Sequence, residues 1–177
     1  MRVLIRQRQP GALHDVGAGL AAGAAGTAAM DAAQALVSRI RPPEEPEREP
    51  PSDEERWEQA PAPAQVVRKA TTSVAGRDID PDRIPALATV VHWLYGSSWG
   101  AGFALAHRRL RGPAAVEGVA FGTAVWAVAY AELVPLQIYE PPWRYPLRSL
   151  AKDLAMHLVY GAATATAFVA ARRALRR

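Results

Sequence analysis

Four long apolar runs dominate the sequence, and each is close to the length that one helix needs to cross a bilayer. They lie at about residues 16–37, 84–106, 114–138 and 150–171. A spanning helix needs roughly 20 residues at a rise of 1.5 Å per residue. An open strand cannot satisfy its backbone polar groups in lipid. The pattern therefore predicts an all-α protein, a four-helix transmembrane bundle that forms a single domain over residues 1–177.

A soluble helical bundle is the alternative, because the first and third runs rely on Ala and Gly and contain acidic residues. These acids are Asp31, Glu117 and Glu132. The second run, however, has no formally charged side chain over its whole length. A soluble amphipathic helix would carry charges on its outer face, so the membrane interpretation is favoured.

Arginine is concentrated in short patches that flank the apolar runs, as is usual for membrane proteins. The patches are Arg2, Arg6 and Arg8; Arg108, Arg109 and Arg111; and Arg172, Arg173, Arg176 and Arg177. Because basic residues in short segments favour the cytoplasmic side, we expect both termini to be cytoplasmic. The patches are not interleaved with aromatic residues, which disfavours nucleic acid as a partner. The absence of Cys excludes disulfides, thiolate metal sites and Cys nucleophiles.

The chain between the first two runs has a different composition. Residues 42–63 are dominated by Pro and acidic residues, which predicts a flexible loop insertion. Residues 64–76 space Val66, Val67, Ala70 and Val74 at helical intervals. This spacing predicts a short amphipathic helix, lying either on the membrane surface or across the end of the bundle.

A repeated motif divides the chain into two halves. "HWLYG" at residues 92–96 returns as "HLVYG" at residues 157–161, and each follows a helix with two glycines four residues apart. The chain therefore resolves into two parallel helical hairpins. In lipid, small residues let helix backbones approach closely, so we expect the glycines to form helix-packing seams. They are Gly19, Gly23, Gly96, Gly100, Gly118, Gly122 and Gly161.

Ionisable and tyrosine side chains of the repeat are predicted to share one polar layer in the outer half of the bundle. His, Tyr and Gly at i, i+3 and i+4 lie on one helix face, and acids of neighbouring helices fall at a similar depth. The members are Asp31, His92, Tyr95, Glu132, Asp153, His157 and Tyr160.

Three interpretations of this layer remain open. It could serve only as interhelical hydrogen bonds in a structural or assembly subunit. It could handle protons or a small polar solute, since His titrates near neutral pH. It could bind haem or a metal through His92 and His157, although no other metal-site motif is present. No catalytic motif is found, so a non-enzymatic protein is expected, with no required cofactor.

Residues 118–161 resemble a known family. The stretch "PLQIYEPPWRYPLRSLAKDLAMHLVYG", preceded by "GTAVWAVAY", is similar to the YagU-like bacterial inner-membrane proteins of unknown function. Pro135, Leu136, the Pro141–Pro142 pair, Trp143, and His157 with Tyr160 carry the match. The resemblance implies a multi-pass protein of the bacterial inner membrane and brings no functional residues with it.

The preferred function is therefore a non-enzymatic membrane protein whose polar layer handles protons or a small polar solute. The structural subunit is the alternative, and a haem or metal protein is third. The expected partners are the lipid bilayer and, through the glycine-rich helix faces, another copy of the chain or other membrane proteins.

Overall fold

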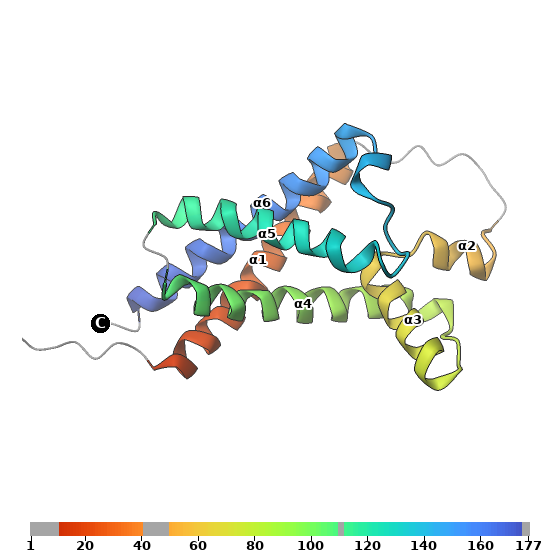
Figure 1. Cartoon of the computed structure of the whole chain (residues 1–177), viewed down its shortest axis with the longest axis horizontal. Coiled ribbons are helices and arrows are strands. Elements are labelled where there is room, and N and C mark those ends of the chain that lie inside the picture. Colours follow the sequence, from red (N-terminus) through yellow and green to blue (C-terminus); the bar gives the residue numbers. More distant parts are fainter. Residues whose placement is uncertain (1–10, 41–49, 110–111, 175–177) are drawn as a thin grey trace, which may run out of the picture.

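A computed structural model describes residues 11–40, 50–109 and 112–174, and every regular element in these ranges is helical (Figure 1). The α-helices are α1 (Ala12–Ile40), α2 (Asp53–Glu58), α3 (Ala62–Ala75), α4 (Ile84–His107), α5 (Ala114–Leu133) and α6 (Leu147–Ala174). Two short 3-10 helices, η1 (Pro81–Arg83) and η2 (Pro142–Arg144), precede α4 and α6. The prediction of an all-α fold is confirmed.

The four long helices correspond to the four apolar runs, with different ends. α1 and α6 extend beyond the predicted limits in both directions, whereas α5 ends at Leu133 rather than at residue 138. The early end has a local cause. Pro135 has no backbone N–H to continue a helix, and Gln137 adopts a left-handed backbone with φ of 53°.

Two of the described helices, α5 and α6, are long and apolar enough to cross a membrane. α1 and α4 do not reach the same level of hydropathy, because Ala and Gly fill much of α1 and because α4 contains His, Tyr, Trp and Ser. The coarser prediction, that the chain contains apolar helices of membrane-spanning length, is confirmed. Four spanning helices remain a prediction.

The long helices pack in the order α4, α1, α6, α5. α1 contacts both α4 and α6 along its length, and α6 also contacts α5, while α4 and α5 touch only slightly. In Figure 1, α1 and α6 run antiparallel, and α4 and α5 cross this pair obliquely. The two predicted hairpins thus correspond to α1–α4 and α5–α6, which are two of the three closely packed pairs. Because α4 and α5 touch only slightly, the four long helices do not form an evenly closed bundle.

Both hairpin pairs are built on glycine. A Cβ atom added to Gly19 would lie 2.6 Å from the carbonyl oxygen of Gly100, so α1 and α4 touch backbone to backbone. The same is true of α5 and α6, where a Cβ on Gly118 would lie 2.9 Å from the oxygen of Gly161. Only glycine permits such close approach.

The seams cover all the glycines that the sequence analysis selected, in corresponding places of the two pairs. Those of the first pair are Gly19, Gly23, Gly96 and Gly100, and those of the second are Gly118, Gly122 and Gly161.

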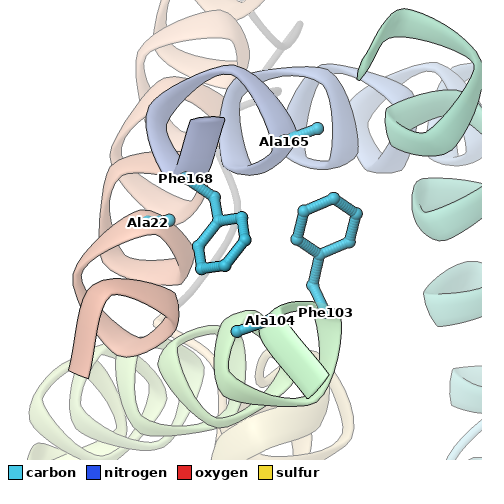
Figure 2. Close-up of a cluster of buried hydrophobic side chains, with 5 residues drawn as sticks. All are labelled: Ala22, Phe103, Ala104, Ala165 and Phe168. Atoms are coloured by element: carbon cyan, nitrogen blue, oxygen red, sulfur yellow. The ribbon is translucent and has the colours of Figure 1, made fainter. Parts of the chain in front are cut away.

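Phe103 and Phe168 fill the space between α4 and α6 (Figure 2). Their rings meet edge to face, with centroids 5.7 Å apart, a favourable aromatic geometry. Ala22, Ala104 and Ala165 complete the buried cluster. Each Phe follows the His of its repeat at the same interval, so the internal repeat extends from the H-x-x-Y-G motif to the core.

The predicted flexible insertion at 42–63 is wrong for its second half, where the chain forms α2 and begins α3; residues 41–49 lie outside the described part. Ser52 and Glu55 form a capping box that starts α2, and Trp57, only 2% exposed, anchors it. Trp57 joins a small apolar cluster with Ala60 and Ala64, which packs against the start of α4.

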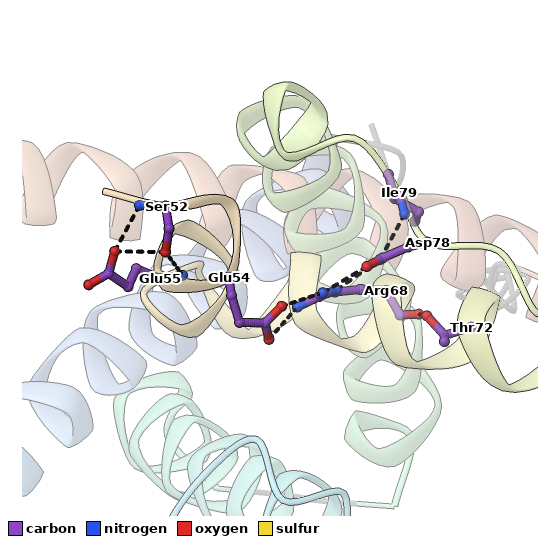
Figure 3. Close-up of polar contacts among 7 residues, drawn as sticks. All are labelled: Ser52, Glu54, Glu55, Arg68, Thr72, Asp78 and Ile79. Atoms are coloured by element: carbon purple, nitrogen blue, oxygen red, sulfur yellow. Dashed lines mark hydrogen bonds and ion pairs between the residues drawn. The ribbon is translucent and has the colours of Figure 1, made fainter. Parts of the chain in front are cut away.

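An ion-pair network holds α2 and α3 together (Figure 3). The Arg68 guanidinium, on α3, binds Glu54 at 2.8 Å and Asp78 at 2.7 Å, and it lies over the Trp57 ring. Arg68 and the Ile79 backbone N–H lower the pKa of Asp78 to about 2. α3 covers the expected surface helix at 64–76 and packs across the start of α4.

Candidate functional site

The first half of the chain brings one Asp, one His and one Trp together. Asp31, near the end of α1, faces two consecutive residues of α4. Its Oδ1 lies 3.2 Å from His92 Nε2, and its Oδ2 accepts a hydrogen bond of 3.2 Å from the Trp93 indole N–H. The sequence analysis selected Asp31 and His92 but not Trp93.

The second half brings the same three residue types together with different hydrogen bonds among them. Asp153 of α6 accepts a hydrogen bond of 3.0 Å from the indole N–H of Trp126 on α5. His157, one turn along α6, lies with Nδ1 2.9 Å from the Asp153 carbonyl oxygen and 3.5 Å from its Oδ1. We call these two groups, Asp31–His92–Trp93 and Asp153–His157–Trp126, the Asp–His–Trp units.

The tyrosines of the repeat connect the helices. Tyr160 is buried and donates a hydrogen bond of 2.7 Å to the Gly96 carbonyl oxygen, which joins α6 to α4. Tyr95 is more exposed and donates to Glu132 Oε2 of α5 at 2.8 Å. Each tyrosine therefore makes one of the interhelical bonds that the predicted polar layer requires.

The predicted layer consists of separate contacts. Among the residues that the structure describes, no hydrogen bond or ion pair joins His92 to His157, and Glu132 contacts Tyr95 rather than either histidine. The described part also contains no cluster of three or more His, Asp or Glu side chains arranged to hold a metal ion.

Aromatic residues of the α5–α6 connection cover the second unit. Tyr139 packs on Tyr130 with ring centroids 5.2 Å apart, and Tyr145 meets the same ring at 6.1 Å. Burial raises the pKa of Tyr139 to about 12, and the negative charge of Asp153 adds to the rise. The Tyr139 phenol therefore stays protonated across the physiological range and lies close enough to Asp153 to be influenced by its charge.

A second polar cluster, which the sequence analysis did not select, lies at the opposite end of the long helices. Asp15 of α1 is 2% exposed and pairs with Arg172 of α6 at 3.3 Å and with Arg108 of α4 at 3.8 Å. Within the described residues, neither Asp15 Oδ2 nor Arg172 Nε has a hydrogen-bond partner, so these contacts are ionic only.

Glu117 completes this cluster. It is 5% exposed; one oxygen lies 2.5 Å from His107 Nδ1, and the other accepts a 3.0 Å bond from the Gly112 backbone N–H. The His107 ring also packs against Phe168, with centroids 5.3 Å apart. We call Asp15, His107, Arg108, Glu117 and Arg172 the charged cluster.

Two features of the sequence could have identified the charged cluster. Asp15 and Glu117 are acids beside or inside apolar runs, and such acids are costly unless they are paired. His107 lies fifteen positions after His92, and Arg172 the same interval after His157, so both follow the internal repeat.

No protein-family model, curated protein or solved structure matches this chain.

Proposed function

We propose that the chain is a non-enzymatic, multi-pass membrane protein that handles protons or a small polar solute at its two Asp–His–Trp units. One observation carries the proposal. Each of the two hairpin pairs, α1–α4 and α5–α6, contains one such unit, beside a long stretch of helix without any formally charged side chain.

Charge-free stretches support insertion of all four long helices. Residues 16–30, 84–106, 118–131 and 154–171 contain no Asp, Glu, Lys or Arg. The surface of these stretches is apolar, with Leu20, Val90, Leu94, Leu105 and Val119 exposed. Exposed large apolar side chains on several long helices favour contact with lipid or protein over contact with water.

The distribution of basic residues supports an orientation. Arg108, Arg109, Arg172 and Arg173 lie at the same end of the long helices, because α4 and α6 both end there and Asp15 pairs with members of both. Short basic segments favour the cytoplasmic side. On this proposal both termini are cytoplasmic and, following the YagU-like resemblance, the membrane is the bacterial inner membrane.

The histidine geometry supports proton handling. A carbonyl oxygen only accepts hydrogen bonds, so the proton of neutral His157 lies on Nδ1, which contacts the Asp153 carbonyl. His157 Nε2 then carries the lone pair of the ring. In His92 the nitrogen beside Asp31 is Nε2, which leaves Nδ1 to accept a proton. Each imidazole thus lies beside a carboxylate, and imidazole is the side chain that most often carries protons in proteins.

The test is proton flux in proteoliposomes loaded with a pH-sensitive dye. His92→Gln and His157→Gln should each reduce the pH-dependent flux, whereas His14→Gln, which changes an exposed histidine at the start of α1, should leave it unchanged. If the first two variants retain full flux and lose thermal stability, the proton-handling proposal is wrong.

That second outcome would instead support a structural or assembly subunit. A specific observation favours this alternative: the Tyr160 bond to the Gly96 backbone and the glycine seams are purely architectural contacts. Tyr160 lies three positions after His157, and Gly96 lies four positions after His92.

A further inference from the structure

A small hollow lies between the last turns of α4 and α6, next to the charged cluster. It is lined by His107, Val169, Arg172 and Arg173 and has a volume of about 140 Å³. Three of its four lining side chains carry nitrogen donors, and they come from two helices. This is enough room for a phosphate group with part of its ester, but not for a large solute.

The charge at this end is unbalanced. Arg108, Arg109, Arg172 and Arg173 contribute four guanidinium groups, while the buried acids are Asp15 and Glu117. Asp15 pairs with Arg108 and Arg172, and within the described residues Arg173 forms no ion pair. The lining of the hollow therefore retains positive charge that an anion would balance.

The surroundings of His107 suit an anion that accepts hydrogen bonds. Both oxygens of Glu117 are engaged, one by His107 Nδ1 and the other by the Gly112 N–H. Glu117 therefore orients the ring and balances its charge when it is protonated. A protonated His107 carries a second N–H, on Nε2, that can donate to a ligand in the hollow.

We infer that this hollow binds the phosphate group of an anionic phospholipid. Arg173 and Arg172 would contact the phosphate oxygens as charge-assisted donors, and the acyl chains would lie along the neighbouring apolar helix surface. This inference rests on the membrane insertion of the proposed function, because only then do the last turns of α4 and α6 meet the headgroup layer. Basic pockets between spanning helices are typical binding places for such headgroups.

The test is native mass spectrometry of the full chain in a neutral detergent, titrated with dioleoyl phosphatidylglycerol or with dioleoyl phosphatidylcholine. The wild-type chain should bind phosphatidylglycerol saturably and phosphatidylcholine more weakly. Arg173→Gln should weaken phosphatidylglycerol binding about fivefold, as expected for one basic residue near an anionic headgroup. Val169→Trp, which fills the hollow without changing the charge, should also weaken it.

Arg148→Gln is the matched control, because Arg148 is an exposed arginine at the opposite end of α6. It should bind phosphatidylglycerol as the wild type does. Equal affinity in Arg173→Gln and the wild type, or equal binding of the two lipids, would overturn the inference. Binding of inorganic phosphate at least as tight as that of phosphatidylglycerol would overturn it too, since the ligand would then be a free anion.

The failure of this inference can be told from that of the proposed function. The protein could remain in liposomes after an alkaline wash and conduct protons, but show no lipid preference. That result refutes only phospholipid binding in the hollow. A protein washed off the liposomes refutes the membrane assignment itself.

Discussion

The substitution Gly23→Ala tests whether the glycine seam holds α1 and α4 together. A Cβ atom on Gly23 would overlap the carbonyl oxygen of Gly96 and lie 2.9 Å from the Cα atoms of Ser97 and Gly100. All three obstacles are backbone, so no side-chain rotation can relieve them. The helices themselves must separate.

The size of the effect follows from these distances. Carbon atoms in comfortable contact are about 3.5–4.0 Å apart, so α1 and α4 must move apart locally by about 1 Å. Overpacking of this kind typically costs about 1–3 kcal/mol. The replacement also gains about 0.5–1 kcal/mol, because alanine favours a helix interior over glycine.

Gly17→Ala separates the two effects. Gly17 lies on the same helix, and a Cβ there would meet no other atom within 4 Å. It should therefore show only the gain in helix propensity. Because both variants share this gain, the difference in their unfolding free energies isolates the clash, at about 1–3 kcal/mol.

The measurement is denaturant unfolding in detergent, followed by far-UV circular dichroism. If Gly23→Ala is as stable as Gly17→Ala, the close backbone contact between α1 and α4 does not exist and the seam is refuted.

Three further predictions concern charge and burial. Arg172→Gln should destabilise the fold by about 3–5 kcal/mol, because the buried Asp15 loses its nearer partner; unfolding in detergent measures this, and an unchanged midpoint would contradict it. The Asp78 pKa is lowered in the folded state, so its pairing with Arg68 contributes stability above about pH 4 and loses it as the pH falls toward 2. The protection factors of the α3 amides, which correct for the intrinsic pH dependence of exchange, should fall over that window, and a fall at neutral pH instead would refute this sign. Trp57→Ala should cost about 3–5 kcal/mol of local stability, with faster exchange in α2 and α3 only; equal loosening of α6 would contradict the separate packing of this cluster.

Several features of the fold were predictable because they depend on residues that are close together in the sequence. The length and the apolar composition of the four runs predict the four long helices. The spacing of small residues predicts the seams, since Gly19 and Gly23 recur as Gly118 and Gly122. The capping box of α2 was also available, as Ser52 followed three residues later by Glu55 is a recognised helix start, but the Pro-rich composition around it hid the signal.

The candidate site was predictable only in part. Asp31 with His92, and Asp153 with His157, were expected near one another, and each pair is in contact. That they form two units instead of one layer depends on how the two helix pairs pack against each other, which no residue spacing encodes.

The indole and arginine partners were decided by tertiary structure alone. Trp126 reaches Asp153 from another helix, and Asp15 meets Arg172 from nearly the opposite end of the chain. Sequence periodicity specifies which face of a helix is apolar or small, because that is a local property. Which faces then meet depends on the crossing of α1 over both α4 and α6, and this is set by the packing of all four helices together.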